Sequence, residues 1–552
     1  DTASEINAAR EHGCGYEAQL ESWYRFLVDP EPVTTLDHTD DTATAIRGDT
    51  NIIVLAQRQA FLRPDSVLAI VMLTDENDCS ILDEDGTQGW LVSYKGGTEP
   101  NAQLWHMPRA TSACDTNPSS PDCRPCDADD RNDPHCQEGL TLPLNEDSMN
   151  MRCFHQAQRF GIDLLYPVQR YIQALTATQI TPRFGGPTVP NPLFAPGPDG
   201  TPGRTGHQIV FAGIVGVPWQ DVATPESLSG PDLEFMTADE LVQQGRWDIM
   251  LGDPVNGVPP TDPLMIESID ERPAGAAHPL VNAPVAASGA AMNVNPINGH
   301  EQTALGIRDD LQFACIYKLP EPVPCTDANQ DVCDCNSDEF SRNSPLCKDT
   351  TSLMNGTQVY GKAYPSVREL QVLKAAGRNG VVASACPKQP ALAPYDDPSA
   401  GYSPAMSALT NAITERFSAP CLPRSLPISQ CAVIEARPAD GDDCETAGRV
   451  TPDGYGADVV ERVRSQLGAL GYDPQSYDLC QIPPLEGDAL DACLSEPSEH
   501  AASAGFCYLD PEQGLGDPNL LANCAPSMKH AIRLVGEPRH NAMTFVACAD
   551  GR

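Results

Sequence analysis

Three runs of apolar residues stand out along the 552-residue chain. The first, at 67–73, is followed by Thr-Asp, and the second, at 208–217, is stopped by Pro218. A shorter third run lies at 381–386. Apolar runs of this length, closed by polar residues or proline, are typical of strands buried on both faces of a parallel sheet. The pattern therefore predicts such a sheet.

Helical periodicity appears between these runs. Five apolar side chains fall on one helical face, at spacings of 4, 7, 8 and 11 from the first: Tyr16, Leu20, Trp23, Tyr24 and Leu27. A second helix is predicted from residue 51 to residue 63, because the proline at 64 disfavours helical backbone before it. Further helices are predicted at 159–175, where Pro167 should divide the helix, and at 367–377, 403–417 and 457–470. Helices that alternate with buried strands indicate an α/β fold.

The 21 cysteines divide the chain further, because they occur in clusters with varied spacings. Such clusters are typical of structural disulfides in secreted or periplasmic proteins. We therefore expect an extracellular, cell-surface or periplasmic location. The predicted organisation is an α/β part at 1–110, a cysteine-rich insertion at 111–158, an α/β helix and strand at 159–217, a loop-rich and cysteine-rich insertion at 218–360, closing α/β elements at 361–420, and a small disulfide-rich domain at 421–552.

Charge and hydropathy exclude several classes of partner. The chain carries 35 Lys and Arg against 76 Asp and Glu, a net charge of −41, which repels nucleic acids and anionic lipid surfaces. No run of 18 apolar residues exists, so no transmembrane segment is predicted. The chain opens at Asp1 without methionine, which indicates processing or a fragment. The odd number of cysteines fits either a partner upstream or one free thiol.

The residues that follow the first apolar run carry the most informative chemistry. Asp75, Glu76, Asn77 and Asp78 place three acids and an amide within four residues. In a parallel sheet, ligands bind outside the carboxyl ends of the strands. Oxygen-rich side chains at that edge suit Mg²⁺ or Ca²⁺, and Asp78 is a candidate for a place beside such an ion. The alternative is that Asp75 only hydrogen-bonds its own loop and that Asp78 is a turn residue.

These residues resemble a known family. A buried strand that ends in Thr-Asp is similar to the fourth strand of von Willebrand factor type A domains, whose aspartate belongs to a metal-ion-dependent adhesion site. Several segments, in order, resemble large cysteine-rich A-like proteins of Gram-negative bacteria, which are secreted or lipid-anchored: 13–17, 61–65, 74–79, 159–163, 505–508 and 545–548. The resemblance implies a doubly wound, mostly parallel sheet with long cysteine-rich insertions. It also implies that Cys14 and Cys79 lie at the same sheet edge, where a disulfide would join them.

The sequence also departs from the family's pattern. The family's Asp-x-Ser-x-Ser motif is missing, and the nearest string, at 397–401, contains a proline and follows no strand. Of the family's ligands only Asp75 can be carried over, and Glu76 stands where a glycine is usual. The simplest explanation is that the chain begins halfway through an A-like domain. A separate or preceding segment would then supply the first strands.

A second candidate cation loop lies in the later cysteine cluster. Asp327, Asn329 and Asp331 have the alternating spacing that opens calcium loops. Valine at 332 stands where such loops need glycine, so an acidic loop held by disulfides is favoured. Two close cysteine pairs have zinc-knuckle or redox spacing but lack the matching second pair or a thioredoxin-like strand: Cys123 with Cys126, and Cys333 with Cys335. Structural disulfides are favoured for both.

Enzyme signatures are missing from the sequence. His300-Glu301 opens like a metalloprotease helix, but no second histidine follows at the required spacing. No nucleophile elbow, phosphate-binding loop or nucleotide fingerprint is present. We therefore expect a non-catalytic extracellular or cell-surface binding protein, with cation-dependent adhesion to a protein partner. The alternatives are a structural subunit that self-assembles and has a degenerate metal site, and a secreted hydrolase whose site lies in the insertions.

Overall fold

The computed structural model describes residues 16–38, 44–64, 66–84, 86–92, 107–143, 146–182, 187–197, 203–204, 206–291, 294–302, 310–326, 333–335, 344–348, 356–391, 397–417, 421–422, 431–439, 444–445, 448–469, 473–495, 505–521, 529–535 and 542–548. It divides into two compact units, Asp1–Ala412 and Ile413–Arg552. The units are described separately below.

A three-stranded parallel sheet forms the centre of the first unit. Its order is β3 (Leu68–Leu73), β6 (Ile209–Val215) and β9 (Gly380–Ser384), with Leu73 opposite Ile214 and Val215 opposite Ser384. Every residue of β6 is buried. The three apolar runs thus form the predicted sheet, and the α/β class is confirmed.

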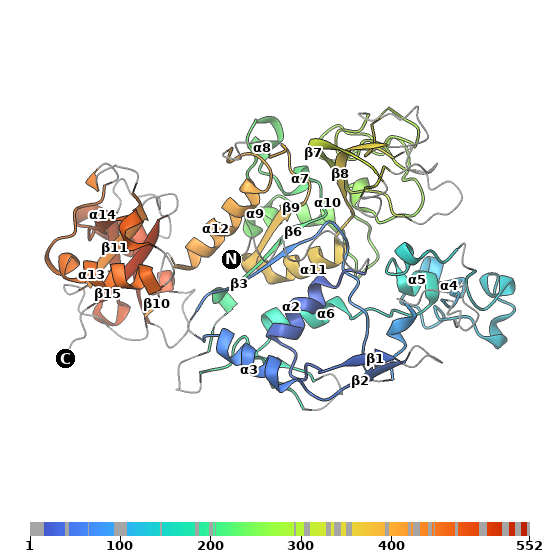
Figure 1. The fold of residues 1–552 in the computed structure, drawn as a ribbon, viewed down its shortest axis with the longest axis horizontal. Helices are drawn as coiled ribbons and strands as arrows, with labels where there is room; N and C mark the ends of the chain where they lie inside the picture. Colours follow the sequence, from blue (N-terminus) through green and yellow to red (C-terminus); the bar gives the residue numbers. More distant parts are fainter. Residues whose placement is uncertain are drawn as a thin grey trace. The chain divides into compact units, whose positions relative to one another are not determined.

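Helices cover the sheet as the sequence predicts (Figure 1). Trp23 on α2, Tyr171 on α6 and Phe211 on β6 pack together, with Trp23 lying 6.0 Å from Tyr171 and 5.5 Å from Phe211 between ring centroids. The predicted helix at 159–175 is divided, because α6 begins only after Pro167. The helices of this unit are α2 (Gln19–Leu27), α3 (Ile52–Phe61), α4 (Ala113–Thr116), α5 (Gln156–Phe160), α6 (Val168–Thr176), α7 (Trp219–Val222), α8 (Pro225–Ser229), α9 (Ala238–Gln243), α10 (Arg246–Met250) and α11 (Val367–Ala376); α12 (Ser403–Phe417) spans the division between the units.

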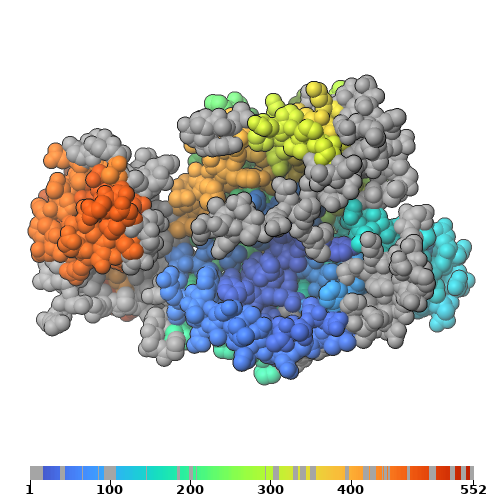
Figure 2. All heavy atoms as spheres, viewed as in Figure 1, coloured from blue at the N-terminus to red at the C-terminus, as the bar shows by residue number. Residues whose placement is uncertain are grey.

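One edge of the sheet leaves apolar side chains uncovered. The residues of β3 alternate between buried and exposed, and Val71 and Leu73 are 48% and 58% exposed. Helix α3 is apolar in sequence, yet Ile52 and Ile53 are 75% and 66% exposed. The N-terminal part of the unit that contains both elements is exposed on the face shown in Figure 2. Exposed apolar residues on an edge strand are a common site of pairing with another chain.

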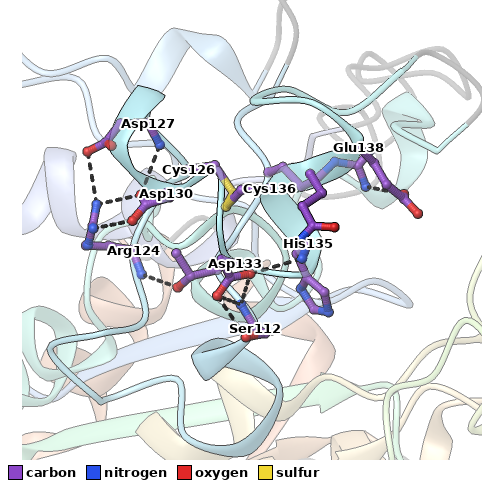
Figure 3. Close-up of a disulfide and its surroundings, with 12 residues drawn as sticks. Ser112, Arg124, Cys126, Asp127, Asp130, Asp133, His135, Cys136 and Glu138 are labelled. Carbon is purple, nitrogen blue, oxygen red and sulfur yellow. Dashed lines mark hydrogen bonds and ion pairs between the residues drawn. A yellow bond between two sulfur atoms is a disulfide. The ribbon is translucent and has the colours of Figure 1, made fainter.

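The cysteine-rich insertion is held by short disulfide loops and carboxylate contacts. Cys114 pairs with Cys123, and Cys126 pairs with Cys136. Figure 3 shows the second pair, with the guanidinium of Arg124 contacting Asp127 and Asp130 beside it. Because Cys123 and Cys126 bond to other cysteines, they do not form a redox pair with each other.

The pairing of Cys79 corrects the expectation drawn from the family. Cys79 bonds Cys153, 74 residues away, and therefore does not pair with Cys14, which lies outside the described residues. This disulfide ties the insertion to the loop after β3. Cys79 and Cys153 come close together because both belong to a small apolar cluster around Phe160 and Leu164.

The segment 218–302 is packed, although its sequence predicts loops. Short helices and turns bury Leu241, Trp247, Met250 and Leu264 in the main core. Each element is shorter than the window over which apolar periodicity becomes visible. Local capping fixes them instead, as in the capping box between Thr237 and Glu240 at the start of α9.

A long hairpin completes the second insertion. Strands β7 (Cys315–Pro324) and β8 (Thr357–Ala363) pair antiparallel, and Cys315 bonds Cys386 just after β9. Disulfides Cys325–Cys333 and Cys335–Cys347 close the loop between the strands. Two short antiparallel pairs also lie in the first unit: β1 (Leu36–His38) with β2 (Ala45–Arg47), and β4 (Gln179–Ile180) with β5 (Val189–Pro190).

The second unit contains two three-stranded antiparallel sheets. One has the order β12 (Tyr477–Ile482), β11 (Cys431–Pro438) and β15 (Met543–Cys548). The other has the order β10 (Cys421–Leu422), β14 (His530–Val535) and β13 (Gly505–Leu509). Helices α13 (Gly454–Ala469) and α14 (Gly487–Ser495) accompany them, and disulfides join Cys444 to Cys480 and Cys493 to Cys507. The sequence predicted only the first of these helices.

Candidate functional site

The loop after β3 meets three other elements at the carboxyl end of the sheet. Thr74 Oγ1 donates to Glu17, just before α2, over 2.9 Å. The backbone N–H of Tyr364 donates to the Asp75 carbonyl over 2.8 Å, and the Ser366 hydroxyl donates to the Glu76 carbonyl over 2.9 Å. The close approach depends on Gly216, since a Cβ there would lie 1.7 Å from the Tyr364 carbonyl oxygen.

The side chains of Asp75 and Glu76 are left without strong partners at this edge. Among the described residues, none outside the loop donates a hydrogen bond to either carboxylate, and both residues are partly buried. Burial, followed by the nearby charge of Asp75, raises the pKa of Glu76 to about 8. Burial also raises the pKa of Asp75 above its usual range, against the attraction of Lys362. Carboxylates with such shifted pKa values are frequent at functional sites.

The carboxylate of Asp78 is held by donors from three parts of the chain. Its carboxylate accepts hydrogen bonds from the N–H of Leu20 over 3.0 Å, from the Ser80 hydroxyl over 2.6 Å and from Arg368 Nε over 3.1 Å. Both oxygens are therefore occupied, and the residue is 1% exposed. Asp78 joins the start of α2 and the first turn of α11 to the loop after β3.

A small pocket opens beside Glu76. Its volume is about 50 Å³, and its lining includes acidic and amide side chains: Glu17, Glu76, Asn77, Asp78, Asn150 and Glu267. Glu267 accepts a hydrogen bond from the Asn77 amide over 3.0 Å and forms an ion pair with His155 over 3.3 Å. The pocket has room for an ion with about one water molecule and is far smaller than a typical substrate site.

Lys362 on β8 is a positively charged side chain that attracts the carboxylates of Asp75 and Glu76 at this edge. Its ammonium lies 2.6 Å from Asp334, and the nearby carboxylates of Asp334, Asp310 and Glu76 outweigh burial and raise its pKa. The Tyr364 hydroxyl donates to Asp310 over 2.6 Å. A fixed ammonium among these acids provides part of the positive charge that a bound cation would supply.

The second predicted cation loop cannot be placed. Asp327, Asn329 and Asp331 lie outside the described residues. The neighbouring Cys333 and Cys335 each bond to a different cysteine, so neither is free to ligate zinc.

A third cluster of ligating groups was missed by the sequence reasoning. Asp221 on α7, Asp262 before the short helix at 263–265, and His278 bring one ligand atom each within 4.8 Å of one another, and all three are buried. Burial raises the pKa of Asp221 to about 7; burial and the charge of Asp221 raise that of Asp262 to about 8. The triad could hold a metal ion. Only Asp221 gave a signal in the sequence, because it follows the second apolar run much as Asp75 follows the first.

Comparison with known proteins does not identify a family for the chain. No family model, no curated protein and no solved structure matches it. The likeness to A-like domains therefore remains a prediction. Within the described residues, no helix is both long and apolar enough to span a bilayer. The eight disulfides seen there indicate folding in an oxidising compartment.

Proposed function

We propose that this chain is a non-catalytic extracellular or cell-surface binding protein that engages its partner through a divalent cation at the carboxyl edge of its parallel sheet. One observation carries the proposal. Asp75 and Glu76 are partly buried without donors from other described elements, beside a pocket lined by the further carboxylates of Glu17 and Glu267. Leaving buried charge uncompensated lowers stability, so such groups are usually kept for binding.

The chemistry of the edge favours Mg²⁺ or Ca²⁺. Its ligands would be carboxylate and amide oxygens, which hard cations prefer, and Asp75 and Glu76 are the residues that would hold the ion. Asp75 lies at the position that the A-like resemblance assigns to a ligand. A protein partner would complete the coordination sphere with its own oxygen atoms.

A catalytic role is less well supported by the described residues. The pocket beside Glu76 is too small for most substrates. A wider hollow of about 370 Å³ in the cysteine-rich insertion includes Glu138 and Glu146, but both carboxylates lie within 4 Å of Arg109. The cluster of Asp221, Asp262 and His278 has no exposed side-chain surface, so a substrate cannot reach it.

Calcium or magnesium titration of the full chain tests the proposal. We expect wild-type protein to bind one divalent cation at the sheet edge, and Asp75→Asn to weaken that binding by about tenfold or more, because a charged ligand is lost. Isothermal titration calorimetry measures the affinity. Glu226→Gln, which removes an exposed acid on α8, is the matched control and should bind as wild type does. Equal weakening in both variants, or no binding by wild type, would rule the cation site out.

Glu76 should also make stability depend on pH. Its folded-state pKa of about 8 lies above the ordinary value of 4.5, so the folded form loses stability as pH rises between those values. We expect Glu76→Gln to match wild type near pH 4.5 and to be more stable by about 1 kcal/mol at pH 8. The full shift is not expected, because partly exposed charges are screened by solvent.

Urea denaturation in the presence of a chelator measures this difference at each pH. The chelator removes any cation that would stabilise the ionised carboxylate. A difference that does not change with pH would show that Glu76 titrates normally and that the edge is well compensated.

A structural or assembly role is the second candidate. The Lys362 ammonium already lies among the acids of the edge, which is the arrangement expected of a degenerate metal site. Val71 and Leu73 also offer exposed apolar surface on a strand that has no neighbour on its outer side among the described residues. This candidate predicts self-association that persists in a chelator, which sedimentation velocity would detect. A monomer at all concentrations would exclude self-association through β3.

A further inference from the structure

The buried cluster of Asp221, Asp262 and His278 joins three separate parts of the first unit. Asp221 lies on α7, directly after the central strand β6. Asp262 precedes a short helix and accepts the N–H of Leu264 over 3.0 Å through one oxygen. His278 lies in a turn closed by a backbone hydrogen bond to Ala283. All three side chains are completely inaccessible to solvent.

Among the described residues, the atoms that face one another have no hydrogen-bond partner outside the cluster. Both oxygens of Asp221, Oδ2 of Asp262 and Nε2 of His278 are buried without a donor or acceptor in hydrogen-bond geometry. His278 Nε2 lies 2.9 Å from Asp221 Oδ1 and 3.7 Å from Asp262 Oδ2. Buried carboxylates are normally paired or bound to a metal, because an uncompensated charge is costly to desolvate.

The surroundings supply too little positive charge to satisfy two carboxylates. Arg246 acts on Asp221 electrostatically, and its Nη1 donates to the backbone carbonyl of Gln220 over 3.3 Å. The other basic group of the cluster, the imidazole of His278, lies 2.9 Å from Asp221 Oδ1 but 3.7 Å from Asp262 Oδ2, so Asp262 is left with no close basic partner among the described residues. A bound divalent cation would supply the missing charge.

We propose that Asp221, Asp262 and His278 form a structural binding site for a divalent transition metal of the zinc class. The nitrogen ligand argues against Mg²⁺ and Ca²⁺, which prefer six or more oxygen ligands, whereas zinc accepts histidine and carboxylate together in four-coordinate sites. Three protein ligands in a closed site leave one position for a water molecule or another donor.

The separations fit such an ion. Tetrahedral zinc with bonds of about 2.0–2.1 Å places its ligand atoms about 3.3–3.4 Å apart. The two distances from His278 Nε2, 2.9 and 3.7 Å, lie on either side of that value. Groups that point toward a common ion do not point toward one another, which agrees with their lack of hydrogen-bond geometry. The metal would fasten the turn at His278 and the segment at Asp262 to the end of β6.

A shared proton is the competing arrangement. His278 Nδ1 lies 3.2 Å and 3.4 Å from the N–H groups of Leu280 and Val281, which it accepts as hydrogen bonds. Coordination through Nε2 requires a proton on Nδ1, so these two contacts must lengthen when a metal binds. Without a metal they remain, the ring proton stays on Nε2 and faces Asp221 Oδ1 over 2.9 Å, and Asp221 and Asp262 share a second proton in a hydrogen bond between their side chains.

The test is metal content and spectroscopy of the full chain. The protein, denatured with its disulfides intact, is refolded with Zn²⁺ or Co²⁺, dialysed, and analysed by mass spectrometry of the elements and of the native protein. We expect one tightly held ion per chain, and for Co²⁺ the intense visible absorption of a four-coordinate site. His278→Gln and Asp262→Asn should lose the ion, while Asp248→Asn, an exposed acid on α10, should retain it.

Each outcome decides the proposal. Loss of the ion in His278→Gln with retention in Asp75→Asn assigns it to this cluster and separates it from the sheet-edge cation. If the variants fail to fold, the cobalt spectrum of wild type still decides, because nitrogen and oxygen ligation in a closed site differs from that of hydrated Co²⁺. Refolded wild type without stoichiometric Zn²⁺ or Co²⁺, and with Asp262→Asn as stable as wild type, establishes the shared proton and overturns the metal site.

Discussion

Removing the disulfide between Cys79 and Cys153 with the double substitution Cys79→Ala/Cys153→Ala is expected to lower the free energy of unfolding of the first unit by roughly 4.5 kcal/mol. The bond closes a loop with a sequence separation of 74, and constraint of the unfolded chain grows with loop length. It also anchors the cysteine-rich insertion to the loop after β3, next to the candidate cation site. We therefore expect weakened cation binding along with lost stability.

The short disulfide between Cys114 and Cys123 provides the matched control. Its sequence separation is only 9, so the corresponding double alanine variant should lose roughly 2.7 kcal/mol. Chemical denaturation, followed by tryptophan fluorescence, measures the free energy of unfolding of both variants, since all five tryptophans belong to the first unit. Equal losses in the two variants would contradict the loop-length argument and indicate that local packing dominates.

Replacing Glu301 by alanine is expected to destabilise the first unit by about 3–5 kcal/mol. Its carboxylate receives Arg272 in a bidentate pair, through Nε over 3.0 Å and Nη2 over 2.9 Å, and accepts the Asn298 amide over 2.8 Å. The two charged side chains are 0% and 1% exposed. Truncation leaves the guanidinium buried without its counter-ion, which costs more than the pair itself contributes.

Two further variants distinguish the contribution of the Arg272–Glu301 ion pair to stability from the cost of leaving one buried charge unpaired. Arg378→Ala removes the partner of an exposed pair with Asp239, where the side chains are 73% and 49% exposed, and should change stability by less than about 1 kcal/mol. The double substitution Arg272→Met/Glu301→Leu keeps the volume without either charge and should recover most of the loss. If the double variant is no better than Glu301→Ala, the hydrogen bonds to Asn298 and the backbone matter more than the charge.

The predictable part of the fold is the part encoded by continuous apolar runs. The strands β6 and β9 were expected because a strand buried on both faces is apolar throughout, whatever its neighbours are. The same reasoning located β3, but the expected burial of both its faces was wrong, because Val71 and Leu73 are exposed. Helix α2 was expected because its buried face repeats with helical spacing. The position of Asp75 at the carboxyl edge follows from strand direction alone. These features depend only on the local sequence, so they can be predicted from a single sequence.

The tertiary structure decided everything that depends on where distant segments meet. Cys79 could pair with any cysteine that the chain brings near, and packing around Phe160 selects Cys153 over the expected Cys14. The sequence left Asp78 open between a turn residue and a neighbour of the cation, and only the fold brings the donors from α2 and α11 to its carboxylate.

The buried cluster of Asp221, Asp262 and His278 has no spacing pattern, because its members come from three turns joined only by the packing of the segment 218–302. The sequence by itself therefore determined the sheet, the disulfide-rich character and the acidic edge at Asp75. Some charged groups have a compensating partner, and others are left buried and free to bind a cation. This difference depends on contacts between residues far apart in the chain, and only the tertiary structure determines those contacts.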